Sequence, residues 1–335
     1  MCLLKVSNLT VKYRSPQGDG IAVDNVSFEL KKGNIVGLAG ESGCGKTTLA
    51  WSIIQLLPSA AEIESGKILL NGKDLLELSP RVMANSIRGK EISVISQNPQ
   101  GSFNPTFKIS TQIMDVLRFS RKKLKRKEPT SLENEIVPQR ESLREAARVW
   151  LERVGIPDAE KRIDEYPHQF SGGMKQRVMI AMAFITNPKI LIADEPTTAL
   201  DATLEAQILE LLKNTIKKYD TSTIYITHNL GVISKLCDIV MIMYAGKIIE
   251  IAKKNELFEC PLHPYTKALL DCIPGRAESG KDLLTIPGTV PNIFELPGGC
   301  SFQPRCQAAK DMCRRREPKL LYVTPDHAVR CFDSC

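Results

Sequence analysis

The chain has 335 residues, which is enough for one large domain with a tail or for two modest domains. Hydrophobic residues make up 43% and charged residues 25%, a balance that is typical of a soluble globular protein and excludes a disordered one. No apolar run approaches the ~18 residues of a membrane span, and the first ten residues lack the pattern of a secretory signal. We therefore expect a cytoplasmic protein.

One basic segment accounts for much of the net charge of +7. Residues 121–127 read RKKLKRK, and a polar segment that is poor in apolar residues follows them. Such a run can contact nucleic acid or anionic lipid headgroups, or it can be an ordinary solvated loop. The polar composition of the following residues favours the mobile loop.

The first half of the chain predicts strands, then a helical region. Residues 1–33 are predicted to form short strands with turns, and residues 34–39 (NIVGLA) a buried strand. Residues 47–57 follow a glycine-rich loop and are predicted to be a helix that Pro58 stops. The remaining expectations in this half are a short strand with a turn at 66–78 and a mostly helical region at about 99–186.

From residue 189 strands and helices alternate, which predicts a mainly parallel α/β sheet with an antiparallel portion on its N-terminal side. After about residue 260 prolines become frequent and periodicity fades, so we expect a domain at 1–260 and a tail at 261–335. The predicted strands are 189–193, 222–227, 238–243 and 247–252, the last two forming a hairpin, and the predicted helices are 203–219 and 229–236.

A phosphate-binding loop is the strongest motif. GESGCGKTT fits G-x-x-x-x-G-K-[ST] between a predicted strand and a predicted helix, the context that this motif requires. Its glycines let backbone N–H groups point at phosphate, and the helix adds the positive end of its dipole. Lys46 would reach the β- and γ-phosphates and the Thr47 hydroxyl would ligate Mg²⁺; the alternative is a turn with incidental glycines. The candidate nucleotide-binding residues are Gly40, Ser42, Gly43, Cys44, Gly45, Lys46, Thr47 and Thr48.

Two further motifs carry polar groups. ILIADEP places Asp194 and Glu195 after an apolar strand, at the sheet edge where α/β proteins bind ligands. We expect Asp194 to hold the Mg²⁺ shell and Glu195 to polarise an attacking water. Ser171, Gly172 and Gly173 open a predicted helix, whose start can bind an anion or can be an ordinary N-cap.

These three motifs, in this order, resemble the ATP-binding cassette (ABC) family. The resemblance implies ATP binding and hydrolysis, and an α/β fold of the ABC-type P-loop NTPase kind. That fold has a RecA-like core, an antiparallel β subdomain, a helical subdomain at about 99–186 and, here, a small irregular cysteine-rich C-terminal extension. The residues 171–173 resemble the signature motif, which contacts the γ-phosphate bound to an opposite cassette, with Phe170 where leucine is usual.

The resemblance also implies roles for residues outside the three motifs. Gln97 resembles the Q-loop residue that senses Mg²⁺ and γ-phosphate, and Ala199-Leu200-Asp201 resembles the D-loop, with Asp201 near nucleotide. His228 resembles the switch histidine, and Tyr13 the aromatic that stacks on adenine. Taken alone, Gln97 could be a polar loop residue, His228 a helix cap and Tyr13 a core aromatic. The implied catalytic residues are Glu195, His228, Gln97 and Asp194, and the implied Mg²⁺ ligands are Thr47, Gln97 and Asp194.

The tail resembles the C-terminal extension of dipeptide/oligopeptide importer ATPases. The strings that carry this are PLHPYTKALL, IPGTVP and GGCSFQPRC, between residues 261 and 306; a proline-rich tail that packs on its own cassette is the structural alternative. The resemblance implies a second cassette, two permease subunits, an indirect substrate-binding protein and a peripheral position on the cytoplasmic face of the membrane. The cargo would be peptides, nickel or oligosaccharides, and no nucleic acid is expected. The alternative function is a soluble ABC ATPase on nucleic acid or ribosomes, but the long coiled coil and the second cassette of those types are absent from the sequence.

Five of the ten cysteines crowd the last 36 residues, which in a reducing compartment indicates metal rather than disulfides. Four thiolates can bind zinc or an iron–sulfur cluster, and the spacing lacks the tight C-x₂-C pairs of zinc fingers. The importer resemblance implies a 4Fe–4S cluster, with Arg305 and Arg314 offsetting its charge; zinc, free buried thiols and disulfides stay open. The candidate ligands are Cys300, Cys306, Cys313 and Cys331, and Cys335 has no assigned role.

Overall fold

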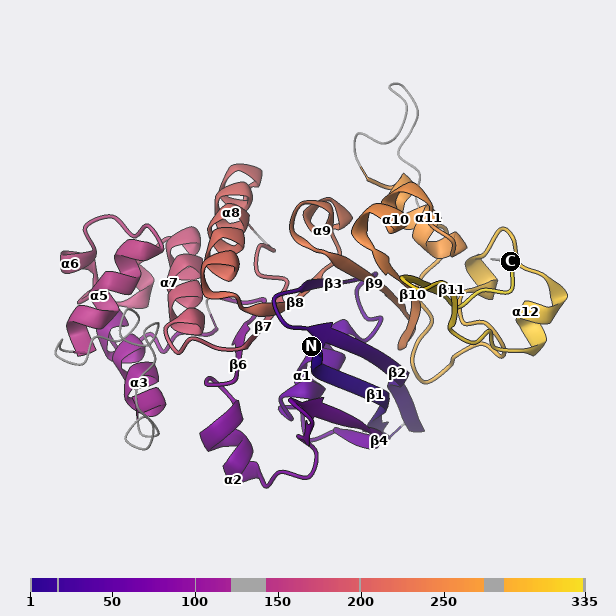
Figure 1. Ribbon diagram of the computed structural model, residues 1–335, viewed down its shortest axis with the longest axis horizontal. Helices are drawn as coiled ribbons and strands as arrows, with labels where there is room; N and C mark the ends of the chain where they lie inside the picture. The colour runs from indigo at the N-terminus through magenta and orange to yellow at the C-terminus, as the bar shows by residue number, and fades with distance from the viewer. Residues whose placement is uncertain are drawn as a thin grey trace. The chain divides into compact units, whose positions relative to one another are not determined.

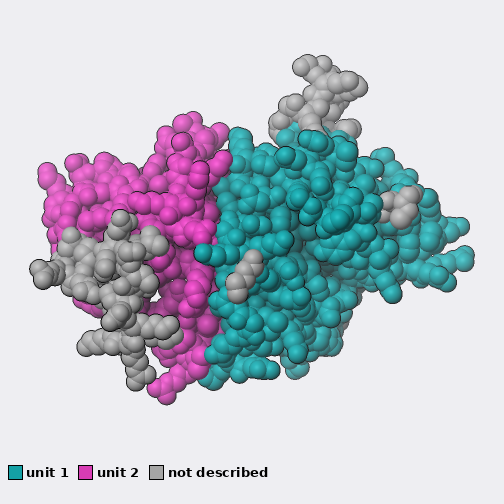
Figure 2. Space-filling view, in the orientation of Figure 1, with its two compact units in different colours: residues 1–79, 224–335 teal, residues 80–223 magenta. Residues whose placement is uncertain are grey.

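The computed structural model describes residues 2–16, 18–99, 101–121, 143–198, 200–273 and 286–333. The chain forms two compact units, coloured in Figure 2: unit 1 takes residues 1–79 and 224–335, and unit 2 takes residues 80–223. Apart from the backbone of Arg121, the basic run 121–127 lies outside the described residues, as does Cys335.

The N-terminal strands of unit 1 form an antiparallel sheet in the order β2-β1-β4-β5. Side chains alternate along β1, so that Leu4 and Val6 are buried on one face. The ladder shifts register between Val6 and Leu9, where Asn8 adopts a φ of 49°, and Leu9 returns to the buried face beyond this bulge. The strands are β1 (Cys2–Ser15), β2 (Gly18–Lys31), β4 (Ala61–Leu70) and β5 (Lys73–Asp74).

The second sheet of unit 1 runs in the order β11-β12-β10-β9-β3, and β8, whose residues from Ile224 belong to this unit, adjoins β3 (Figure 1). β3 and β9 are parallel, whereas β9 and β10 form the predicted antiparallel hairpin. Ala245 and Gly246 turn this hairpin at φ values of 43° and 83°. The strands are β3 (Ile35–Ala39), β8 (Ser222–Thr227), β9 (Ile239–Tyr244), β10 (Lys247–Lys253), β11 (Leu321–Thr324) and β12 (His327–Val329).

Short helices cover the sheets of unit 1. α1 packs on β1 and β2, α9 packs on β3, and α10 packs on β9 and β10. The helices are α1 (Lys46–Ile53), α9 (Leu230–Leu236), α10 (Lys254–Glu259), α11 (Pro264–Asp271), the 3₁₀ turn η4 (Gln303–Arg305) and α12 (Asp311–Arg315).

Unit 2 combines two parallel strands with a group of helices. β6 lies parallel to β7, and α7 packs on β6 and on α5 and α8. The fully buried Trp150 of α5 stacks near Tyr219 of α8, with ring centroids 5.5 Å apart. The elements are α2 (Pro80–Val82), the π-turn η1 (Met83–Ile87), β6 (Ile92–Ile95), α3 (Ile109–Arg121), α5 (Leu143–Arg153), α6 (Ala159–Arg162), η3 (Pro167–Gln169), α7 (Gly172–Phe184), β7 (Ile190–Asp194) and α8 (Ala202–Tyr219).

The C-terminal tail is joined to the sheet of unit 1, and it contains two strands that its irregular sequence did not predict. β12 pairs with β10, and β11 pairs with β12. A fully buried carboxylate on β10, Glu250, accepts hydrogen bonds from the backbone N–H groups of Leu262 and His263 at 2.7 and 2.9 Å. His327 Nε2 lies 2.7 Å from the same carboxylate. The tail therefore packs on β10 of unit 1 through a buried polar centre.

In the part of the chain that the structure describes, no helix is long and apolar enough to cross a membrane.

Substitution of Glu250 by alanine should destabilise unit 1 strongly. The change leaves two N–H donors, one of them buried, and a buried imidazole without their acceptor, which costs about 2 to 5 kcal/mol of unfolding free energy. Glu62→Ala is the matched control, because it removes an exposed carboxylate that pairs with Arg14 and should change stability little. Urea unfolding followed by circular dichroism measures both variants, and equal midpoints would contradict the structural role of Glu250.

Candidate functional site

The glycine-rich loop 40–48 passes close to other backbone segments of unit 1. It connects β3 to α1, and Gly45 is the N-cap of α1 with a φ of 106°. A Cβ at Gly40, where φ is 155°, would lie 2.2 Å from the carbonyl oxygen of Met243, and a Cβ at Gly45 would lie 2.2 Å from that of Ala22. These two positions thus require glycine for space as well as for backbone conformation.

The side chains of the loop agree with a phosphate site. Lys46 is buried, and its Nζ donates to the carbonyl oxygens of Gly40 and Glu41, each at 2.8 Å. Thr47 is exposed at the first turn of α1, where a hydroxyl is accessible to a ligand. Burial raises the pKa of the Cys44 thiol, so this side chain stays neutral and fills space beneath the loop.

Two other predicted residues of unit 1 lie at the ends of strands. The Tyr13 hydroxyl at the end of β1 is 3.3 Å from Thr48 Oγ1, and the ring is only partly buried, so the structure brings Tyr13 to the loop rather than into the core. His228 follows β8 and is exposed. The helix-cap alternative for His228 is wrong, because Asn229 is the N-cap of α9 and its Oδ1 accepts from Gly231 N at 2.9 Å.

The two adjacent acids lie in unit 2, at the end of β7. Asp194 is 3% exposed, and Glu195 follows it in the left-handed region with a φ of 46°, which non-glycine residues seldom adopt. Glu195 Oε2 accepts from Gln97 Nε2 at 3.0 Å and from Thr198 Oγ1 at 2.9 Å. The structure therefore joins Gln97 to Glu195, and Thr198 is a second partner that sequence reasoning missed.

The Ser-Gly-Gly segment begins α7. Ser171 is its N-cap, with Oγ accepting from Met174 N at 3.3 Å, so the N-cap interpretation is confirmed. Ser171 and Gly172 remain exposed, whereas a Cβ at Gly173 would lie 2.5 Å from the Leu204 side chain of α8. Ser171 and Gly172 can thus face a ligand, while Gly173 packs against α8.

The segment that resembles the D-loop is described only in part. Asp201 is the N-cap of α8 and accepts from Leu204 N at 2.9 Å. Ala199 lies outside the described residues.

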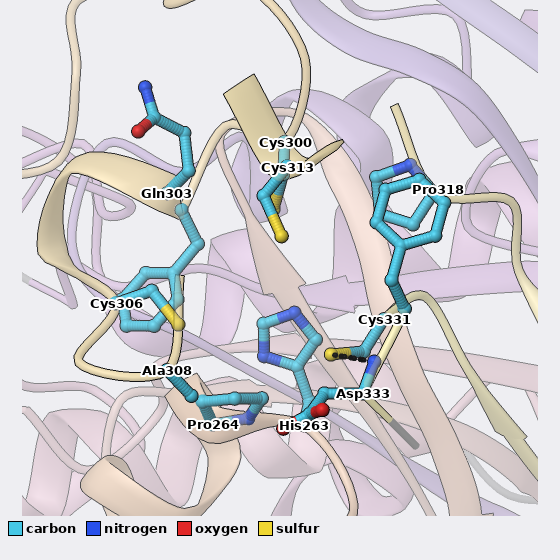
Figure 3. Close-up of a pocket in the computed structure, with 12 residues that line it drawn as sticks. His263, Pro264, Cys300, Gln303, Cys306, Ala308, Cys313, Pro318, Cys331 and Asp333 are labelled. Atoms are coloured by element: carbon cyan, nitrogen blue, oxygen red, sulfur yellow. Dashed lines mark hydrogen bonds between the residues drawn. The ribbon is translucent and has the colours of Figure 1, made fainter. Parts of the chain in front are cut away.

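Four cysteines of the tail line one pocket in unit 1, together with His263 (Figure 3). Cys300 and Cys313 lie on adjoining segments, since Cys300 N donates to the carbonyl oxygen of Cys313 at 2.8 Å. Figure 3 shows Cys306 and Cys331 on opposite sides of the pocket. Burial raises the pKa of the Cys300, Cys306 and Cys331 thiols, and the neighbouring thiols raise it further.

The four predicted cysteine ligands line the same pocket, but their side chains are not arranged around a common metal position. Within the described ranges, no three His, Cys, Asp or Glu side chains are placed to hold a metal ion. Four soft thiols around one space nevertheless have the chemistry of a zinc or iron–sulfur ligand set. Arg305 departs from its expected role, because its guanidinium pairs with Glu41 of the phosphate loop instead of facing the thiols.

Comparison with known families agrees with these features. The family profile described as "ABC transporter" matches residues 23–198. The profile described as "Oligopeptide/dipeptide transporter, C-terminal region" matches residues 249–313, which include three of the four pocket cysteines.

Similar proteins match along nearly the whole chain. The oligopeptide transport ATP-binding protein OppD of Salmonella typhimurium is 42% identical over 98% of this chain and 93% of its own length. The dipeptide transport ATP-binding protein DppD of Bacillus subtilis is 44% identical over 98% and 94%. A solved dimeric ATP-binding cassette in a post-hydrolysis state, bound to ADP and Pi, is 25% identical with a TM-score of 0.62, over 75% of this chain and 98% of that one. The chain therefore belongs to the ABC transporter ATPase family, among the members that carry the oligopeptide/dipeptide transporter C-terminal region.

Proposed function

We propose that this chain is the subunit that hydrolyses ATP to drive a membrane importer of dipeptides or oligopeptides. The observation that carries the proposal is the likeness to OppD and DppD over 98% of the chain, tail included. A second cassette and two permease subunits would complete the importer, with a substrate-binding protein that delivers the peptide. The chain would then lie on the cytoplasmic face of the membrane, held there by the permeases.

The loop 40–48 would cradle the ATP phosphates. Its backbone N–H groups and the start of α1 supply the positive field, and Lys46 would move from the carbonyl oxygens of Gly40 and Glu41 to the β- and γ-phosphates. Tyr13 beside Thr48 would stack on adenine. Ser171 and Gly172, exposed at the start of α7, would meet the γ-phosphate of a partner cassette, with Asp201 nearby.

Thr47, Gln97 and Asp194 would hold Mg²⁺. Their hydroxyl, amide and carboxylate oxygens are hard ligands of the kind that this ion prefers. Bound there, Mg²⁺ would neutralise charge on the β- and γ-phosphates.

Glu195 would orient the water that attacks the γ-phosphate. Gln97 and Thr198 both donate to Glu195 Oε2 and so fix the direction of the carboxylate. His228, exposed after β8, would contact the γ-phosphate and complete the site. Phosphoryl transfer to water depends mainly on such positioning and on charge neutralisation.

Glu195→Gln should keep ATP binding and lose hydrolysis. The amide preserves the shape of the side chain but not the carboxylate that polarises water, so kcat should fall by roughly a hundredfold or more. Steady-state phosphate release by the assembled transporter measures kcat, and nucleotide titration measures binding. Glu210→Gln, an exposed carboxylate on α8, is the matched control and should hydrolyse ATP normally. Hydrolysis by Glu195→Gln at the parental rate would show that Glu195 has another role.

We further propose that Cys300, Cys306, Cys313 and Cys331 hold a 4Fe–4S cluster. All four line one pocket, and four cysteine thiolates are the ligand set that such a cluster takes. Such a cluster would supply four iron–thiolate bonds that cross-link the tail.

The full chain, purified without oxygen, should therefore be brown and contain about four irons. Cys313→Ser should lose the colour and the iron, whereas Cys260→Ser, an exposed cysteine outside the pocket, should keep both. Iron analysis and visible absorption measure this without reference to activity. A colourless chain with one zinc ion, or with no metal, would rule out the cluster and leave the ATPase proposal untouched.

A further inference from the structure

Arg305, an arginine of the tail with a buried side chain, forms an ion pair with Glu41, the second residue of the phosphate loop. Arg305 Nη1 donates to Glu41 Oε2 at 2.7 Å, and Nη2 donates to Glu41 Oε1 at 3.0 Å. This bidentate geometry is the strong form of an arginine–carboxylate pair. The Arg305 side chain is only 5% exposed and the Glu41 side chain 30%, so solvent screens the pair only in part.

Other contacts fix the direction of the guanidinium. Its Nε donates to the carbonyl oxygen of Pro287 at 2.8 Å, and Nη1 lies 3.4 Å from the Tyr244 hydroxyl. The arginine is thus held by β9 and by the tail before it reaches Glu41, and little side-chain entropy is left to lose when it pairs.

The tail also holds the main chain of Glu41. The N–H of Glu41 donates to the Tyr265 hydroxyl at 3.0 Å. Tyr265 is fully buried on α11, and its ring centroid lies 4.7 Å from that of Tyr244 and 5.2 Å from that of Phe302. Glu41 is therefore held by its side chain and by its backbone, in both cases by residues of the C-terminal extension.

Glu41 is next to the groups that would meet phosphate. Its carbonyl oxygen accepts from Lys46 Nζ at 2.8 Å, so the loop lysine and Arg305 contact the same residue from two sides. An unpaired carboxylate at this position would repel the negative triphosphate, and the paired guanidinium cancels that charge.

We propose that Arg305 is a positioning residue of the ATP site, through which the C-terminal extension sets the affinity of the phosphate loop for nucleotide. The inference rests on the proposed role of the loop 40–48. Arg305 acts through Glu41, by fixing the second residue of the loop and by neutralising its carboxylate, and it does not itself touch ATP.

The test is fluorescence titration of the full-length chain with the ATP analogue MANT-ATP. Arg305→Met should raise the Kd roughly tenfold or more, because a partly buried, charge-assisted pair is lost and Glu41 stays charged. Arg305→Lys should recover only part of the affinity, since an ammonium cannot make the bidentate pair. Adding Glu41→Gln to Arg305→Met should lower the Kd again, because it removes the uncompensated charge. A merely structural arginine would show no such rescue.

Arg330→Met is the matched control. Arg330 also ties the tail to β10, with Nε donating to the carbonyl oxygen of Ile248 at 3.2 Å, and it pairs with Glu317 away from the loop. The Kd of the Arg330→Met variant for MANT-ATP should stay at the parental value. Thermal melting monitors the folding of every variant.

Four results would count against the inference. A parental Kd for Arg305→Met would overturn it, and so would an equal loss of affinity in Arg330→Met. In Arg305→Met with Glu41→Gln, a Kd no lower than that of Arg305→Met alone would overturn the charge argument. If Lys46→Ala binds MANT-ATP with the parental Kd, the assignment of the loop itself is overturned, and this inference with it. If Lys46→Ala loses binding while Arg305→Met keeps it, only the inference fails.

Discussion

The tight passage of the glycine-rich loop past neighbouring backbone is the constraint on which the rest of the site depends. Two carbonyl oxygens, of Met243 and Ala22, lie where side chains at Gly40 and Gly45 would need to be. The loop can therefore point its N–H groups outward only if β9 and β2 are in place behind it. Gly246, at the hairpin turn, adds a further support by donating to the carbonyl oxygen of Cys44 at 2.9 Å. The loop is local in sequence, but its shape is set by strands far along the chain.

The C-terminal extension continues the same support. Its strand β12 extends the sheet from β10, and the buried Glu250 fixes the entry to α11, from which Tyr265 reaches Glu41. Arg305 directly precedes Cys306, so one short segment both lines the cysteine pocket and holds the phosphate loop. A change that orders the cysteine pocket will therefore also order the segment that contains Arg305 and Cys306.

Much of the fold could be predicted from local patterns, because strands, turns and helix caps depend on neighbouring residues. Periodicity placed β3, α1, β7 and α8, and the phosphate motif identified the loop with the glycine positions that the structure requires. The pair between Glu41 and Arg305 could not be predicted, since 264 positions separate the two residues and neither stands in a pattern that points to the other. Thr198 lies only three positions from Glu195, but no motif marks it as a partner of that carboxylate. The strands of the tail could not be predicted because their alternation is too short to read.

The central claim is that the C-terminal extension holds the phosphate loop, and amide hydrogen exchange of the full-length chain tests it most directly. Tyr265→Phe removes only the hydroxyl that accepts from Glu41 N. The account predicts severalfold faster exchange of the Glu41 amide in this variant, with exchange in β6 unchanged. An unchanged exchange rate at Glu41 would contradict the claim that the extension holds the loop.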